Sequence, residues 1–365
     1  MNNLKYWLGF SKLGFACSQS LINVWGHYEN IENSWNAPKE ELLAIEGVAS
    51  VFVKRFCETR KTINLNKLED DFKTKDIQVL TIDDEKYPYL LRHIYDPPLV
   101  LFIKGNLDDC DLDQTLAVVG SRKHSHYIAE ILPKVLGGLA GSDTTVVSGM
   151  ALGIDAIAHE AALANNLKTI AVLGGGLENV YPKQNLNLFN RIIDGNGAVI
   201  SEYYPDEKPD PWKFPARNRI VSGLSKGTLV AEAGLKSGAL ITANITLDQG
   251  RELMCIPGLI TNPFTAGINL LLKNGATVIT EGEDILDYFG WAKDTEISTE
   301  NATEKFNLLD NESKIYNTLS LEPKKIDEIA NLTQLGIEDI MIVLTSMEIM
   351  GLIKQIPGEQ YIRAL

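Results

Sequence analysis

The segment KFPARNRIVSGLS combines residue types that bind a polyanion. Phe214 offers a flat ring on which a nucleobase can stack. Lys213, Arg217 and Arg219 offer cations for phosphate, and the two arginines present forked donors. The segment therefore predicts a site for a nucleic acid, with all four side chains as candidate contacts.

The spacing of Arg217 and Arg219 does not decide whether the two side chains point the same way. Arg217 and Arg219 share one side if the segment is extended and lie nearly opposite each other if it is helical. We expect Arg217 to face outward, toward the nucleic acid. The alternative is that one of the two arginines pairs with Glu202 or Glu232 inside the fold.

A second cationic segment, AVVGSRKHSHY, begins with a short apolar run. Gly120 permits a sharp turn after this run, and the amides near the following helix start can point at an anion. Arg122 adds a bidentate clamp for phosphate. We predict that Gly120, Ser121 and Arg122 bind phosphate, while an ordinary solvated helix start is the alternative.

A third segment, VVSGMALGIDAIAHEAAL, has small residues after an apolar run. Gly149 and Gly153 allow the backbone to approach a ligand closely, and we include Gly149 among the nucleic-acid contacts. Asp155 and His159 lie four residues apart on the expected helix and can share a face. They could form an acid–base pair, but we favour an N-terminal carboxylate and a histidine that packs in the core.

A fourth segment, AVLGGGLENVYPKQN, carries three glycines in a spacing that does not match the dinucleotide pattern G-x-G-x-x-G. Tyr181, Pro182 and Lys183 place a ring, a rigid turn and a cation in one loop, so we predict that Lys183 contacts phosphate. The sequence contains no Walker A, G-x-S-x-G or H-E-x-x-H motif. We therefore expect a binding protein that has no catalytic residues and no cofactor.

These segments belong to a region, residues 76–290, in which short apolar runs rich in β-branched residues end in glycine or serine. Helical patterns separate most of the runs. This alternation predicts an α/β fold: a Rossmann-like, doubly wound, mostly parallel sheet with helices on both faces. Ligands bind such sheets at the carboxyl ends of the strands, which is where the four segments lie.

The regions on either side of this core have different patterns. Residues 1–75 are helical and polar, with apolar residues around Gly47, and predict a helical domain of the SAM or helix-hairpin-helix type. Residues 291–312 are acidic and aperiodic, which predicts a linker. Residues 313–365 show three helical patterns and a strand pair, which predicts a winged-helix domain.

The third of these helical patterns, IEDIMIVLTSMEIM, contains no arginine or lysine. A helix that reads a DNA groove needs basic or amide side chains. The composition therefore favours a domain for protein interaction or self-association over a DNA reader.

The composition of the whole chain limits the remaining possibilities. Its 365 residues are 45% hydrophobic and 22% charged, as in a globular protein, and its net charge of −14 argues against general coating of nucleic acid. A local basic patch on an acidic body remains compatible with this charge. Four cysteines without a C-x-x-C pair predict free thiols in a reducing cytoplasm and no metal site. The sequence contains no apolar run of about 18 residues, so we expect no membrane span.

Seven segments, taken in order, resemble the DNA-processing protein A family of bacteria, also called DprA or Smf. They are GSR, SGMALGIDAIAH, GGGLENVYPKQN, ISEY, FPARNRIVSGLS, EAGLKSGALITA and GRELMCIPG. The resemblance implies an extended Rossmann fold that binds single-stranded DNA without catalysis, protects incoming DNA in natural transformation and loads the RecA recombinase onto it. It also implies a homodimer formed through the Rossmann domain, and DNA contacts by Arg122, Lys183, Phe214 and Arg217.

Two other functions remain as alternatives. The segment KGTLVAEAG distantly resembles the Gly-Gly-x-Gly-Thr-x-x-Glu loop of lysine-decarboxylase-like phosphoribohydrolases, in which the glutamate is catalytic. Here Ser225 and Lys226 replace the two glycines, and Glu232 lies one residue too far along. Nucleotide hydrolysis is therefore a minor alternative, and a protein-interaction adaptor that does not touch DNA is another.

Overall fold

The structure is a computed structural model whose contacts divide the chain into two units, Met1–Asp294 and Thr295–Leu365. It describes residues 3–14, 19–195, 197–293, 310–319, 324–350, 352–356 and 360–363. The boundary expected at residue 75 stays a prediction, because the first unit contains both the helical region and the core. Most of the expected linker lies outside the described residues.

The first unit is built on a sheet with the strand order β1-β2-β6-β5-β4-β3-β7-β8-β9. The neighbours from β6 to β9 in this order pair in parallel, whereas β2 pairs antiparallel with both β1 and β6. The predicted mostly parallel α/β fold is confirmed. The strands are β1 (Gln78–Thr81), β2 (Val100–Gly105), β3 (Thr115–Gly120), β4 (Thr145–Ser148), β5 (Lys168–Val172), β6 (Ala198–Ser201), β7 (Gly227–Glu232), β8 (Glu252–Cys255) and β9 (Thr277–Val278).

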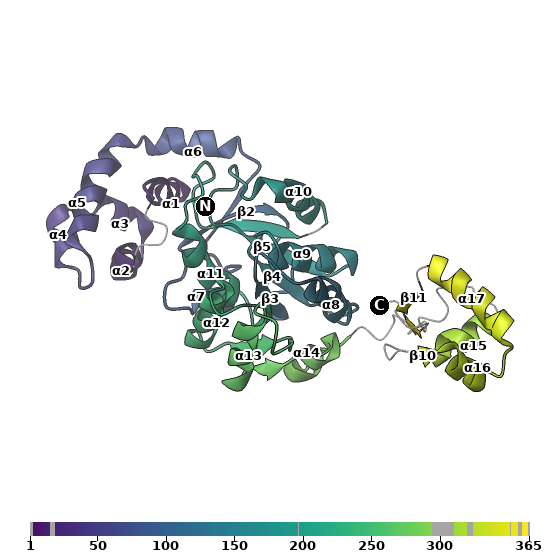
Figure 1. The fold of residues 1–365 in the computed structure, drawn as a ribbon. Helices are drawn as coiled ribbons and strands as arrows, with labels where there is room; N and C mark the ends of the chain where they lie inside the picture. The colour runs from purple at the N-terminus through teal and green to yellow at the C-terminus, as the bar shows by residue number, and fades with distance from the viewer. Residues whose placement is uncertain are drawn as a thin grey trace. The chain divides into compact units, whose positions relative to one another are not determined.

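Helices cover both faces of this sheet because its strands are apolar on both sides. Leu116 and Val118 of β3 pack in one core with α8, α9 and α14, while Ala117 and Val119 belong to the core that includes α11 and α12. Figure 1 shows α8 and α9 on one side of β3 to β5 and α11 on the other. The helices of this region are α7 (Tyr89–Arg92), α8 (His126–Gly137), α9 (Ile154–Ala164), η2 (Lys183–Asn185), α10 (Leu186–Asp194), α11 (Lys213–Gly223), α12 (Ala239–Asp248), α13 (Ala266–Lys273) and α14 (Gly282–Phe289).

The N-terminal residues are helical, as predicted. They form α1 (Leu4–Lys12), α2 (Gln19–Tyr28), α3 (Ile31–Asn36), α4 (Lys39–Ala44), α5 (Ser50–Thr59), η1 (Arg60–Thr62) and α6 (Leu65–Lys73). Gly47, with φ of 75°, lies in the turn between α4 and α5. The rings of Phe10, Trp35 and Phe56 hold these helices together, with centroids 5.0–5.5 Å apart. Phe72 of α6 contacts the sheet, since its ring centroid lies 5.9 Å from that of Phe102.

The second unit has the helices and strands of a winged helix. They are α15 (Asp310–Thr318), β10 (Lys324–Lys325), α16 (Ile326–Thr333), α17 (Ile337–Ile349), β11 (Ile353–Ile356) and β12 (Gln360–Arg363), and the strands pair in the order β10-β12-β11. Ile329, Ile340 and Leu344 are buried in its core. The turn expected at Pro357 and Gly358 lies outside the described residues.

Two expectations from composition concern membranes and thiols. Among the described residues, no helix has the length and apolar character needed to cross a membrane. Cys57, Cys110 and Cys255 are free thiols, and burial raises the pKa of Cys110 and Cys255 to about 12. Cys17 lies outside the described residues. The two buried thiols are therefore protonated at neutral pH.

Candidate nucleic-acid interface

A cleft of about 940 Å³ lies at the carboxyl ends of β3, β4 and β7. The first of the four segments contributes Phe214, Pro215, Arg217 and Asn218 to its lining, and the other segments contribute Gly120 to Lys123, Gly149 and Tyr181. These residues meet because the carboxyl ends of parallel strands emerge at the same edge of a sheet. The structure therefore brings residues from all four sequence segments to one cleft.

Two rings and one cation gather in this cleft. The centroid of the Phe214 ring lies 5.6 Å from that of Tyr181, with 42° between the planes. The guanidinium carbon of Arg122 lies 5.7 Å from the Phe214 centroid. Arg122 and Tyr181 are exposed and Phe214 is half-buried. A ring with accessible surface beside an exposed guanidinium can stack on a base while the cation holds the neighbouring phosphate.

Arg217 faces inward, so the expectation that it points outward is wrong. Its Nη1 donates hydrogen bonds to the carbonyl oxygens of Gly149, at 2.5 Å, and of Val172. A Cβ at position 149 would lie only 2.6 Å from this guanidinium, so the close approach requires glycine. Burial lowers the pKa of Arg217, and the nearby Asp155 opposes that shift. Arg217 thus holds the backbone at the ends of β4 and β5 together where it lines the cleft.

Asp155 and His159 have separate partners in the structure. The Asp155 carboxylate accepts a hydrogen bond from the backbone N–H of Ala151 at 3.3 Å, and burial raises its pKa while Arg217 lowers it. His159 is fully buried, contacts the Thr169 hydroxyl through Nδ1 at 2.7 Å and has its pKa lowered to about 3 by burial. The interpretation of an N-terminal carboxylate and a histidine packed in the core is confirmed, because Asp155 lies in the first turn of α9 and His159 is buried.

Gly153 sets the distance between the first helical turn of α9 and the loop that carries Arg122. Its φ is 83°, and a Cβ there would lie 2.5 Å from the carbonyl oxygen of Ser121. The N–H of Ile154 donates to that same oxygen at 3.3 Å. A side chain at position 153 would therefore push the Arg122 loop away from α9.

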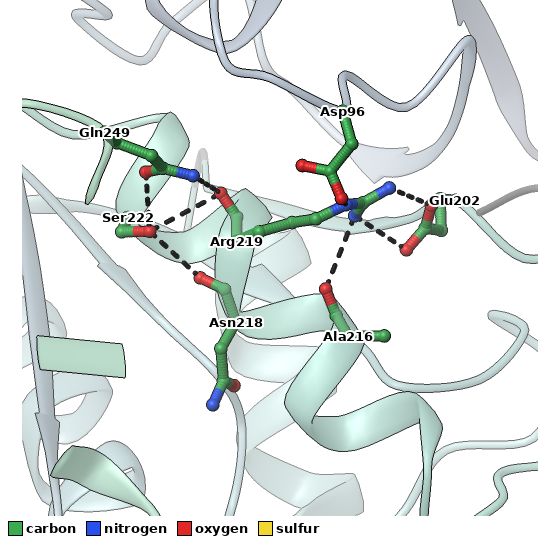
Figure 2. A network of polar contacts seen from close by, with 7 residues as sticks. All are labelled: Asp96, Glu202, Ala216, Asn218, Arg219, Ser222 and Gln249. Carbon is green, nitrogen blue, oxygen red and sulfur yellow. Dashed lines mark hydrogen bonds and ion pairs between the residues drawn. The ribbon is translucent and has the colours of Figure 1, made fainter. Parts of the chain in front are cut away.

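Lys213 and Arg219 are buried in internal ion pairs and do not line the cleft. Nζ of Lys213 lies 2.7 Å from Glu207. Figure 2 shows the Arg219 guanidinium directed at Asp96 and Glu202, at 2.9 and 2.7 Å. The segment is helical, so Arg217 and Arg219 point in nearly opposite directions. The alternative that one arginine pairs with Glu202 is confirmed. Lys213 and Arg219, which we predicted as nucleic-acid contacts, have their charges directed into the fold instead.

The remaining predicted cation, Lys183, is exposed at the start of η2 but lies outside the residues that line the cleft. Sequence reasoning missed a further cation that lines the cleft, Lys236, which follows β7 and is exposed. Leu235 and Ser237 also line the cleft, and the Ser237 hydroxyl lies 3.2 Å from that of Ser121. The sequence pattern could have predicted this cation, because Lys236 lies between two glycines just after an apolar run, as expected for a loop at the end of a strand.

The chain matches two known protein-family domains, one within each of its two units. Residues 78–290 match the family described as DNA recombination-mediator protein A. The chain belongs to this family. Residues 300–359 match the winged-helix domain of DprA. The chain thus carries both the core domain and the winged-helix domain of DprA.

Relatives and solved structures of the DprA family cover most of the chain. Protein Smf of Synechocystis sp. is 34% identical and spans 98% of both chains. An X-ray structure of DprA from Streptococcus pneumoniae has a TM-score of 0.69 and 39% identity, covering 79% of this chain and 97% of that one. A structure of DprA from Helicobacter pylori, described for its mode of binding single-stranded DNA, has a TM-score of 0.52 and 30% identity, covering 58% and 94%.

Proposed function

We propose that this DprA-family protein binds single-stranded DNA in the cleft at the ends of β3, β4 and β7. The observation that carries the proposal is the Tyr181–Phe214 ring pair, which lies beside the exposed guanidinium of Arg122. Stacking on aromatic rings needs unpaired bases, whereas a duplex keeps its bases inside. The DNA-binding relative from Helicobacter pylori supports the same function.

The charges around the cleft favour a polyanion. Arg122, Lys123 and Lys236 line it and are exposed. Among the described lining residues the one carboxylate is Asp155, which is buried next to Arg217. Because the chain has a net charge of −14, the rest of its surface disfavours DNA. Binding should therefore be confined to the cleft and should weaken with salt.

A fluorescence-anisotropy titration with labelled oligo-dT tests this proposal, with a duplex of equal length for comparison. We expect tighter binding of the single strand and an affinity that falls steeply between about 50 and 200 mM salt. The informative variant is Arg122→Ala combined with Lys236→Ala, because Arg217 has a structural role. If this double variant binds as tightly as the wild type, the cleft is not the DNA site.

We further propose that the protein loads the RecA recombinase onto the bound strand, and so acts in the cytoplasm during natural transformation. The family description as a recombination mediator supports this role. RecA filament formation on DNA coated with single-strand-binding protein should become faster when the protein is added. Unchanged filament formation would limit the function to binding and protection.

We also propose a homodimer formed through the Rossmann domain. The strand β9 lies at an edge of the sheet, where Val278 is exposed, and Leu270 of the preceding α13 is exposed as well. An edge strand flanked by apolar side chains favours pairing with another strand. Sedimentation velocity should show a dimer that Val278→Asp converts to a monomer. The control Val51→Asp changes an exposed valine of α5 and should leave the dimer intact.

The position of Glu232 argues against nucleotide hydrolysis, the alternative function. The carboxylate that would serve catalysis accepts two hydrogen bonds from Ser125 and is buried. Incubation with nucleoside monophosphates should therefore release no free base. Release of free base would favour a phosphoribohydrolase and count against a function limited to binding.

A further inference from the structure

The last residue of β7, Glu232, contacts the Arg122 loop through its side chain. One carboxylate oxygen accepts the backbone N–H of Ser125 at 2.8 Å, and the other accepts the Ser125 hydroxyl at 2.5 Å. Only 1% of Glu232 is exposed. Both oxygens of a buried carboxylate are thus used to hold one residue of the loop.

The main chain of Glu232 holds the other end of the same loop. Its carbonyl oxygen accepts the N–H of Ser121 at 2.8 Å. Gly120 pairs with Glu232 at a point where the register between β3 and β7 shifts, so the loop leaves the sheet there. One residue therefore fixes both Ser121 and Ser125, while Arg122 and Lys123 lie exposed between them.

The Ser125 hydroxyl links Glu232 to the start of α8 through hydrogen bonds. It donates to Glu232 and accepts the N–H of Ile128, in the first turn of the helix, at 3.3 Å. The start of α8 is a place where a phosphate could bind, but the Glu232 carboxylate already occupies the N–H and hydroxyl of Ser125. These Ser125 groups are therefore not available to a phosphate, whereas the exposed side chains of Arg122 and Lys123 are.

We propose that Glu232 is a positioning residue of the DNA site, which holds the loop from Ser121 to Ser125 so that Arg122 and Lys123 face the phosphates of the strand. The inference rests on the proposed function. A loop that is ordered before binding loses less conformational entropy when DNA binds, so its cations contribute more to affinity. Glu232 contributes without touching the DNA.

Oligo-dT binding by Glu232→Ala, Glu232→Gln and the control Glu160→Ala tests this inference. We expect Glu232→Ala to weaken binding about tenfold, the size expected for loss of one charge-assisted contact. Glu232→Gln keeps one acceptor oxygen and should fall between Glu232→Ala and the wild type. Glu160→Ala removes an exposed ion pair with Arg191 and should bind like the wild type. Wild-type affinity in Glu232→Ala would overturn the proposal.

A double-mutant cycle separates positioning from a general loss of stability. If Glu232 acts through the loop cations, Glu232→Ala should cost less than about twofold when Arg122→Ala and Lys123→Ala are already present. A full tenfold loss on that background would show that Glu232 acts elsewhere and would overturn the proposal. If Glu232→Ala does not fold, Glu232→Gln serves in the same cycle.

Hydrogen exchange tests the clamp without DNA. In Glu232→Ala the amide of Ser125 should exchange faster, whereas the amide of Ser121, which bonds to a main-chain oxygen, should keep its rate. Unchanged exchange at Ser125 would overturn the proposal. If the wild-type protein fails to bind oligo-dT, the proposed function fails, and the exchange at Ser125 still decides whether Glu232 holds the loop.

Discussion

Arg219 of α11 and Glu202, which follows β6, form a bidentate ion pair inside the Rossmann core. Nη1 and Nη2 of Arg219 lie 3.0 and 2.7 Å from the two carboxylate oxygens of Glu202. Both side chains are buried, and Nε of the arginine also donates to Asp96 at 2.9 Å (Figure 2). The pair fixes α11, the helix that presents Phe214 to the cleft.

Breaking this pair should destabilise the fold. Glu202→Ala leaves the Arg219 guanidinium buried without its main partner, so the free energy of unfolding should fall by about 3–5 kcal/mol. Urea denaturation followed by circular dichroism measures the change. The control Lys86→Ala removes an exposed pair with Asp108 and should cost less than about 1 kcal/mol. Equal losses in the two variants would contradict a structural role for the buried pair.

Removing the Phe214 ring should weaken DNA binding with little dependence on base sequence. We expect Phe214→Ala to reduce the binding free energy for oligo-dT by about 1–3 kcal/mol, because one stacking platform is lost. Phe214→Tyr keeps the ring and should retain most of the affinity. Tyr95→Ala removes an exposed ring that does not line the cleft and serves as the control in the anisotropy titration. Equal affinities for Phe214→Ala and the wild type would argue against stacking.

Lys236 should contribute to binding through its charge. In Lys236→Ala, the plot of log affinity against log salt concentration should become less steep by about 0.7, the value for one phosphate contact on a single strand. Lys236→Arg should keep the slope. Lys134→Ala, on the exposed side of α8, is the matched control. A wild-type slope in Lys236→Ala would show that Lys236 does not contact a phosphate of the bound strand.

The buried His159 should make the fold sensitive to acid. Its pKa of about 3 lies below the ordinary value of 6.5, so the folded state binds fewer protons than the unfolded state between these values. The stability it contributes is complete above pH 6.5 and is lost as pH falls toward 3. Between pH 7 and pH 5 this group should lower the free energy of unfolding by about 2 kcal/mol.

His159→Gln provides the measurement of this acid sensitivity, because glutamine can still contact Thr169 but does not titrate. Urea denaturation at pH 7 and pH 5 should show that the stability difference between the two conditions is about 2 kcal/mol smaller in this variant. An unchanged difference would mean that other groups cause the acid sensitivity.

The location of the cleft could be predicted because it depends on local patterns. Apolar runs that end in glycine or serine predicted strands, and helices between them predicted parallel pairing. Parallel pairing in turn predicts that the strand ends share one edge. This is why residues as distant in sequence as Arg122, Gly149 and Phe214 were expected at a common site, and they line one cleft.

The roles of individual cations could not be predicted in the same way. Lys213, Arg217 and Arg219 carry the same charge and lie close together in the sequence, yet all three are buried and hold backbone or carboxylates in place. Lys236 went unnoticed in the sequence, although it lines the cleft. A cation's partner is set by distances across the fold, which charge and spacing do not specify.

The sequence by itself determined the layered α/β core, the helices on either side of Gly47 and the edge of the sheet where ligands bind, because hydrophobic periodicity and glycine placement act over a few residues. Only the tertiary structure decided which polar groups face the cleft and which form hydrogen bonds or ion pairs inside the fold. Arg217 meets the carbonyl of Gly149, and Glu232 meets Ser125, only after separate strands have come together. Such pairings arise from contacts over about 70 to 110 residues of sequence, a range that no local pattern covers.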